Sequence, residues 1–223
     1  AAPYVASPRE RLAYGFGWKS AADRFGDPAL YQRATDQLQR VLDATGSDDE
    51  ARLRAHLLLA FIHDVRNRKR EAEDHYRAVL EQDPDNLQAR NNLAVLLTES
   101  GGDPAEALRL ARAAVEGQRD NPTLLDTLAA AQHHAGRVDD AAATMQRVLE
   151  LDPGNPEWQV RLAEIRLAQG RADEAADLAD QALRTLEARD PAQPSTQLIL
   201  MEKIKERARS VQRETRPEAA QAS

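Results

Sequence analysis

The chain has 223 residues, of which 30% are charged and 4% aromatic, with no cysteine and a formal net charge of −7. The lack of cysteine excludes disulfides, thiolate catalysis and Cys-based zinc sites. Basic and acidic residues are interleaved along the chain, which argues against nucleic-acid binding, and no run of about 18 apolar residues is present to span a membrane.

The first residues do not decide between an exported and a cytoplasmic protein. The chain begins with Ala1, Ala2 and Pro3 rather than with an initiator Met. Small residues at this position fit a periplasmic or exported protein after removal of a signal peptide, but a truncated cytoplasmic chain fits equally well.

Residues 1–14 are expected to form an N-terminal extension, followed by a first helical hairpin at 15–48. Gly15 and Gly17 flank Phe16 as a lone G-x-G with no strand before it. We interpret this tripeptide as a flexible start of the hairpin rather than as a nucleotide site. A short linker at 46–50 is expected to follow the hairpin.

From residue 52 onward the sequence repeats itself with a period of 34–35 residues. Small residues recur in two sets: Ala60, Ala94, Ala129 and Ala163 form one, and Ala72, Ala107, Ala141 and Ala175 form the other. Small side chains at fixed positions let two helices pack closely, and large aliphatic side chains fill the space around them. The period predicts hairpins at 52–86, 87–121, 122–155 and 156–190, stacked to give one continuous core.

Helix start and stop signals agree with this division. Asn residues stand at the expected starts of three first helices, and glycines stand at the expected turns inside three hairpins; these are Asn86, Asn121, Asn155, Gly101, Gly136 and Gly170. Asn is a preferred N-cap, and glycine accepts the left-handed conformation that ends many helices. One residue is inserted near Gly102, inside a turn.

The C-terminal segment is expected to close the array. Residues 195–213 predict one capping helix, whose apolar stripe consists of Met201, Ile204, Ala208 and Val211. A terminal repeat needs such a polar outer face for solubility. Residues 214–223 are polar and are expected to form a flexible tail.

These motifs resemble the tetratricopeptide-repeat family. The segment with Leu128, Ala129, Gly136, Ala141 and Pro153 is similar to its consensus, and the hairpin at 15–48 resembles a degenerate copy. The resemblance implies an all-α fold, a right-handed superhelical α-solenoid of about five units plus a capping helix. It also implies a non-enzymatic module that binds a protein or peptide partner in a concave groove lined by the first helix of each hairpin.

No catalytic motif is present, and neither a cofactor nor a metal site is expected. His56 and His63 stand where the family places aromatic residues between helices, so we expect them to pack there. Glu71 and His75 are four residues apart, which predicts an exposed pair on one helix face. His133 and His134 are adjacent and point in different directions.

The resemblance implies which residues face the groove. The candidates for partner binding are Leu57, Leu58, Phe61, Asn91, Asn92, Val95, Asp126, Thr127 and Arg161. The first three predict an apolar anchor site, and the two asparagines beside it are expected to bond a partner's backbone. Two alternatives remain: residues 1–14 fold back over the apolar patch with Tyr4, Val5, Leu12 and Tyr14, or the three residues belong to the core.

An adaptor that binds a peptide or a partner's helix is the favoured function. A self-assembling scaffold, a homo-oligomer with the N-terminal aromatic residues at its interface, is one alternative. The other is a regulatory fragment of a larger secretion or assembly component.

Overall fold

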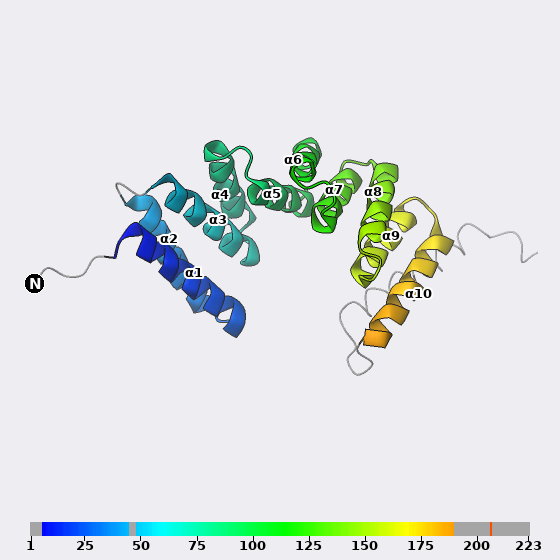
Figure 1. Ribbon diagram of the computed structural model, residues 1–223, viewed down its shortest axis with the longest axis horizontal. Helices are drawn as coiled ribbons and strands as arrows, with labels where there is room; N and C mark the ends of the chain where they lie inside the picture. The colour runs from blue at the N-terminus through cyan, green and yellow to red at the C-terminus, as the bar shows by residue number, and fades with distance from the viewer. Residues whose placement is uncertain (1–5, 45–47, 190–205, 207–223) are drawn as a thin grey trace, which may run out of the picture. The chain divides into compact units, whose positions relative to one another are not determined.

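A computed structural model describes residues 6–44, 48–189 and 206. Ten helices and no strand are found in these residues. The helices are α1 (Pro8–Phe25), α2 (Pro28–Asp43), α3 (Asp49–Val65), α4 (Lys69–Gln82), α5 (Leu87–Ser100), α6 (Pro104–Gly117), α7 (Pro122–His134), α8 (Val138–Leu151), α9 (Pro156–Ala168) and α10 (Ala172–Arg189). They form two compact units, with α1–α5 in the first and α6–α10 in the second (Figure 1).

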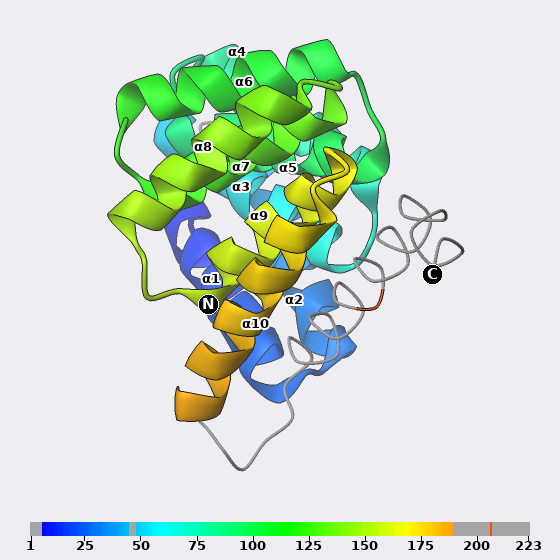
Figure 2. The ribbon, with the colours of Figure 1, turned by 90° about the vertical axis from the view of Figure 1, so that its right-hand side faces the viewer.

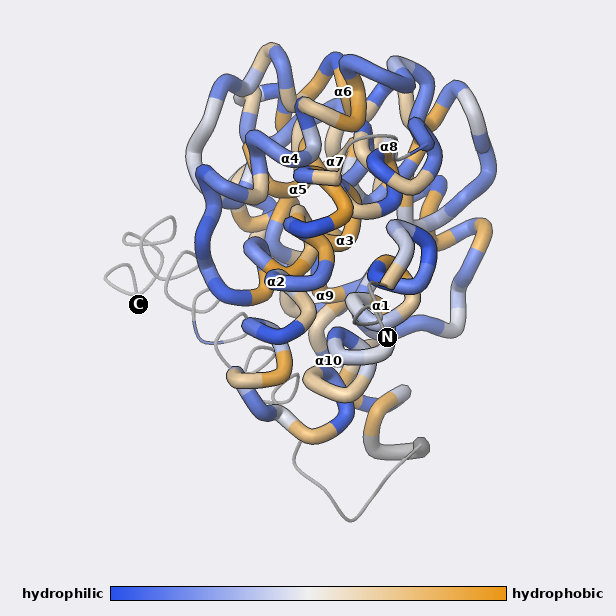
Figure 3. Tube along the Cα trace, turned by 90° about the vertical axis from the view of Figure 1, so that its left-hand side faces the viewer, coloured by the Kyte–Doolittle hydropathy of each residue, from blue (hydrophilic) through white to orange (hydrophobic). Residues whose placement is uncertain are grey.

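The first unit is built from helices that pack against their neighbours along the chain. α1 pairs with α2, α3 pairs with α4, and α2 and α4 contact the helices that follow them. Apolar and polar residues alternate along the helices of this unit that face the viewer in Figure 3. The apolar sides meet in a core that includes Leu38, Val41, Leu59 and Ile62, all fully buried.

α1 begins seven residues before the predicted start of the first hairpin. The Ser7 side chain accepts a hydrogen bond from the Glu10 backbone N–H, and the Glu10 carboxylate accepts one from the Ser7 backbone N–H. This capping box, with Pro8 at the first helical position, starts the helix early. Residues 8–14 are therefore helical, and Gly15 and Gly17 lie inside α1 rather than in a flexible start.

The turns use the residues that the sequence predicts, with one substitution. Gly101, Gly136 and Gly170 all have φ between 69° and 74°, the left-handed region. In the turn between α3 and α4 this conformation is taken by Asn67, at φ 57°. Asparagine tolerates left-handed backbone better than other non-glycine residues. The N-cap roles predicted for Asn86, Asn121 and Asn155 are confirmed, because each side chain accepts a backbone N–H of the following helix.

The second unit follows the same plan from Asp103 onward. α7 pairs with α8, and α9 and α10 lie side by side (Figure 2). Its core includes Met145, Val148 and Leu162, with the Trp158 indole Nε1 donating to Asp152 at 2.9 Å. The unit begins next to Gly102, where the sequence carries its inserted residue.

Two predicted segments differ from or fall outside the described residues. α3 begins at Asp49 with Asp48 as its N-cap, so residues 48–50 belong to the helix start rather than to a linker. The predicted capping helix at 195–213, apart from Glu206, and the predicted tail at 214–223 lie outside the described residues.

Candidate functional site

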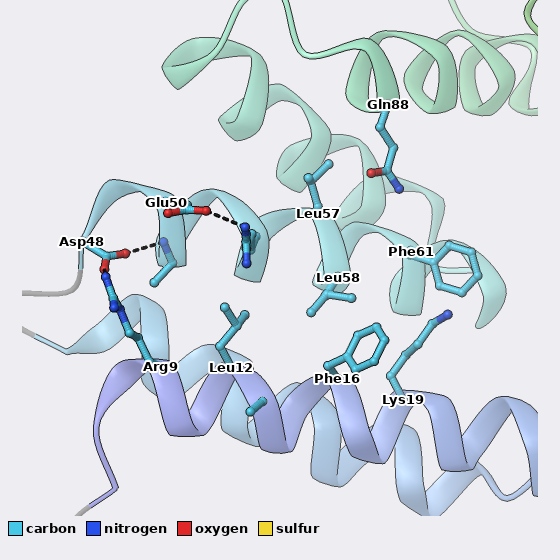
Figure 4. Close-up of a pocket in the computed structure, with 13 residues that line it drawn as sticks. Arg9, Leu12, Phe16, Lys19, Asp48, Glu50, Leu57, Leu58, Phe61 and Gln88 are labelled. Atoms are coloured by element: carbon cyan, nitrogen blue, oxygen red, sulfur yellow. Dashed lines mark hydrogen bonds and ion pairs between the residues drawn. The ribbon is translucent and has the colours of Figure 1, made fainter.

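The first unit has a pocket of about 820 Å³ between α1 and α3, with one residue from α5 (Figure 4). Apart from Asp48, the N-cap of α3, and Gln88 of α5, its lining residues come from the two helices. The full set is Arg9, Leu12, Ala13, Phe16, Lys19, Asp48, Glu50, Ala51, Arg54, Leu57, Leu58, Phe61 and Gln88. The size is in the range of small-molecule and peptide side-chain sites.

The three residues predicted to form an apolar anchor all line this pocket. Leu57, Leu58 and Phe61 are half-buried. They lie on one side of α3, while Leu59 and Ile62 point into the core. Leu57 and Phe61 are not part of this core cluster, whereas Leu58 also packs against it, so the second alternative holds in part for Leu58 alone.

α1 supplies the opposite wall rather than a cover. Leu12 and Phe16 are one helical turn apart and point toward Leu58 in Figure 4. Phe16 is 58% exposed, and Tyr14, which does not line the pocket, is 49% exposed. Of the residues expected to fold over the patch, Leu12 faces Leu58 from the opposite wall and Tyr14 does not line the pocket, while Tyr4 and Val5 lie outside the described residues.

Two exposed ion pairs lie at one end of the pocket. Arg9 Nη2 contacts Asp48 Oδ2 at 3.0 Å, and Arg54 pairs with Glu50. Asp48 also accepts the Ala51 backbone N–H, which, together with Arg9, lowers the pKa of its carboxyl group. The charges at this end thus have partners within the first unit.

The other end presents a lysine. The Lys19 ammonium lies 3.9 Å from the centre of the Phe61 ring and 2.7 Å from Asp23 Oδ2. Asp23 in turn accepts the Tyr31 hydroxyl at 2.8 Å. Burial acts to raise the pKa of Asp23, but the hydrogen bonds from Lys19 and Tyr31 outweigh it and leave the pKa below its usual value. The Lys19 ammonium group therefore lies over Phe61, at the edge of the apolar patch of Leu57, Leu58 and Phe61.

The α5 residues that the sequence predicts for partner binding lie outside the pocket. Asn91, Asn92 and Val95 are half-buried, and none of them is among the residues that line the pocket. Asn92 Oδ1 accepts from Asn91 at 3.3 Å, and its side chain is hydrogen-bonded to Tyr76. The Asn92 side chain is thus hydrogen-bonded within the first unit, whereas Asn91 Oδ1 is buried and has no hydrogen-bond partner among the described residues.

Among the predicted residues of the second unit, only some reach the surface. Arg161 Nε lies 3.2 Å from Asp126 Oδ1 across α7 and α9. Burial raises the pKa of Asp126, although the Arg161 guanidinium acts to lower it. Thr127 is 5% exposed and its hydroxyl donates to the Thr123 carbonyl, so it offers no surface to a partner.

The histidines of the first unit form an unpredicted cluster. His56 and His63 pack between helices, as expected. The exposed Glu71–His75 pair is a wrong prediction, because His75 packs against both of those histidines instead. Across the described residues, no group of three or more His, Asp or Glu side chains is arranged to hold a metal ion.

The helical wall that α1 forms with Leu12 and Phe16 was not predicted, since Leu12 was expected in an extension folding over the patch and Phe16 was not assigned to the groove. The signal was present, because Ser7 and Glu10 form the S-x-x-E pattern that marks a helix start. A helix beginning there places Leu12, Phe16 and Lys19 along one face, since residues three and four apart are neighbours. No comparable sequence pattern indicates that Gln88 lines the pocket.

Comparisons with known proteins agree with this architecture. Tetratricopeptide-repeat family models match residues 57–122, 100–159 and 133–196. No curated protein matches the chain. None of the helices in the described residues is long and apolar enough to cross a membrane.

Several solved structures share the fold at low sequence identity. MamA (residues 41 to the end) from Desulfovibrio magneticus RS-1 has a TM-score of 0.66 and 17% identity, covering 81% of this chain and 97% of its own. TTC0263, a thermophilic TPR protein in Thermus thermophilus, has a TM-score of 0.60 and 20% identity, covering 92% and 98%. YrrB, described as a TPR protein with an unusual peptide-binding site, has a TM-score of 0.64 and 16% identity, covering 90% and 98%. The fold is an all-α helical-repeat solenoid, and the chain belongs to the tetratricopeptide-repeat family.

Proposed function

We propose that this protein is a non-enzymatic interaction module whose α1–α3 pocket binds apolar side chains of a protein or peptide partner. Tetratricopeptide-repeat proteins are protein–protein interaction modules. The observation that carries the proposal is the partly exposed apolar lining of the pocket, formed by Leu12, Phe16, Leu57, Leu58 and Phe61. Apolar surface gathered in one concavity marks a binding site more often than scattered apolar residues do.

The size of the apolar lining supports a partner that inserts a few large side chains. Burying one Leu or Phe side chain completely is worth roughly 1.5–3 kcal/mol. Three such side chains would contribute ~5–8 kcal/mol before the cost of ordering the partner. A Kd of 1 μM corresponds to about 8 kcal/mol of net binding free energy, so these side chains alone, less the cost of association, support a weak and reversible contact.

The charged ends favour a partner whose apolar residues are flanked by polar ones. Asp48 and Glu50 are paired with arginines, and Lys19 is paired with Asp23. A partner therefore does not have to neutralise an isolated charge in this pocket. The description of YrrB as having an unusual peptide-binding site supports a peptide as the ligand class.

A displayed library of short peptides, selected on the full chain, tests this proposal. Phe16→Glu and Tyr14→Glu form a matched pair, because both residues are exposed aromatics on α1 but only Phe16 lines the pocket. We expect selected peptides to carry two or three large apolar residues and to lose at least about tenfold in affinity on Phe16→Glu, a change of ~1.4 kcal/mol. Equal binding to both variants would contradict the proposal.

Self-assembly is the second candidate, and exposed aromatic residues favour it. Phe25 is 70% exposed and Tyr14 is 49% exposed, both on the first helix of the first unit. Sedimentation of the full chain over a wide concentration range tests this directly. A mass that rises with concentration, and that falls in a Tyr14→Ser, Phe25→Ser variant, would support a scaffold; a constant monomer mass would exclude it.

A further inference from the structure

Three histidine rings are packed together between α3 and α4. His56 Nδ1 and His75 Nδ1 are 2.9 Å apart, a hydrogen bond in which one nitrogen donates and the other accepts. The ring centres of His56 and His75 are 5.2 Å apart, and those of His63 and His75 are 5.4 Å apart in a stacked arrangement. His75 therefore lies between the other two.

The arrangement of the three rings disfavours the protonation of more than one of them. A neutral imidazole offers one donor and one acceptor nitrogen, but a protonated ring offers two donors. If both His56 and His75 were protonated, two N–H groups would face each other at a separation of 2.9 Å. His63 is 8% exposed, and its Nδ1 has no hydrogen-bond partner among the described residues.

The charged groups that act on the three rings come from α3, α4 and the turn between them. They are Arg52, Arg66, Arg68, Glu71, Asp74 and Glu81. Arginines and acids are balanced in number, so they do not supply a surplus of negative charge to stabilise several imidazolium ions. Burial dominates and lowers the pKa of all three histidines, that of His75 to about 4, with His56 and His63 adding to the effect on His75.

We propose that His56, His63 and His75 form an acid-sensitive contact that holds α3 against α4 at neutral pH and loosens this hairpin in acid. α3 carries His56 and His63 on the side facing His75 of α4, and it carries Leu57, Leu58 and Phe61 on the side facing the pocket. Loosening the hairpin therefore disturbs one wall of the pocket. This response to acid does not depend on what the pocket binds.

The direction of the pH effect follows from the histidine pKa values. Each folded-state pKa lies below the ordinary value of 6.5, so the unfolded hairpin binds more protons than the folded one. The stability contributed by the neutral cluster is fully present above about pH 6.5 and is lost as the pH falls toward 4.

Hydrogen exchange on the full chain at about pH 7 and about pH 5 tests the proposal, after correction for the intrinsic pH dependence of exchange. Peptides from residues 56–80 should lose about tenfold or more in protection at the lower pH, the equivalent of one pKa unit of differential proton binding. Peptides from α7 and α8 should change much less.

Two variants localise the effect. His75→Asn removes the titrating ring and retains polar atoms near the position of Nδ1, so it should abolish most of the loss of protection. His133→Asn removes an exposed histidine in the second unit and should behave as the wild type. An equal loss in His75→Asn and wild type would overturn the proposal.

A measurement on the unmodified chain keeps the test decisive if His75→Asn fails to fold. NMR titration of the ring Cε1 protons should show three histidines whose midpoints lie below the ordinary pKa of 6.5. Titration of all five histidines near 6.5 in the folded chain would overturn the proposal.

Discussion

At the residue scale, Gly15 of α1 is a position where the close approach of Leu38 from α2 requires glycine. An added Cβ at Gly15 would lie 2.6 Å from Leu38 Cδ2 and 2.7 Å from Leu38 Cγ, and Leu38 is fully buried. Overpacking of this kind costs ~1–3 kcal/mol. The higher helix propensity of alanine, worth about 1 kcal/mol, offsets part of this cost. We expect Gly15→Ala to lower the free energy of unfolding, measured by urea titration.

Gly17 is the matched control on the same helix. No atom lies within 4 Å of an added Cβ there, so only the helix propensity changes. Gly17→Ala should raise the free energy of unfolding by up to ~1 kcal/mol. A stabilising effect of both substitutions would show that α1 and α2 do not pack as described. The sequence could not separate these glycines, because the distinction depends on Leu38 from another helix.

At the element scale, the helix caps determine where the hairpins begin. Asn121 accepts hydrogen bonds from the backbone N–H groups of Thr123 at 3.0 Å and Leu124 at 3.4 Å. Asn121→Ala should destabilise α7 by about 1 kcal/mol, because N-cap loss leaves those donors unpaired. Asn121→Asp keeps the acceptor and should be close to neutral in the same thermal or urea unfolding experiment. Equal losses in the two variants would mean that the cap is not what stabilises this helix start.

The elements were also the part of the fold that the sequence predicted best. The hairpin turns and caps follow from single residues such as Asn121 and Gly136, whose local chemistry is independent of the rest of the chain. Only the α3 wall of the pocket was predicted, because Leu57 and Phe61 occupy positions that face the groove in the tetratricopeptide-repeat family. The α1 wall was not predicted, because it depends on the early helix start at Pro8. The pairing of His75 with His56 joins two helices, and no pattern within either helix indicates it.

At the scale of the whole molecule, local contacts predict that unfolding is not uniform. Within each unit, helices contact mainly their neighbours along the chain, which in repeat proteins couples stability over short distances. The two tryptophans, Trp18 in α1 and Trp158 in α9, report on different units. Gly15→Ala should lower the urea midpoint seen by Trp18 more than that seen by Trp158, each measured with the other tryptophan replaced by Phe. Equal shifts would indicate one cooperative transition.

Site-specific photo-crosslinking in the source cells can establish whether the α1–α3 pocket contacts a partner. A photoreactive phenylalanine analogue at Phe16 lies in the pocket, whereas the same analogue at Tyr14 lies on the same helix outside it. We expect a crosslink to one partner from position 16, no such crosslink from position 14, and loss of the position 16 crosslink on Leu57→Glu in a chain of unchanged helicity. Crosslinks of equal yield from both positions, or a position 16 crosslink that survives Leu57→Glu, would contradict a contact through this pocket.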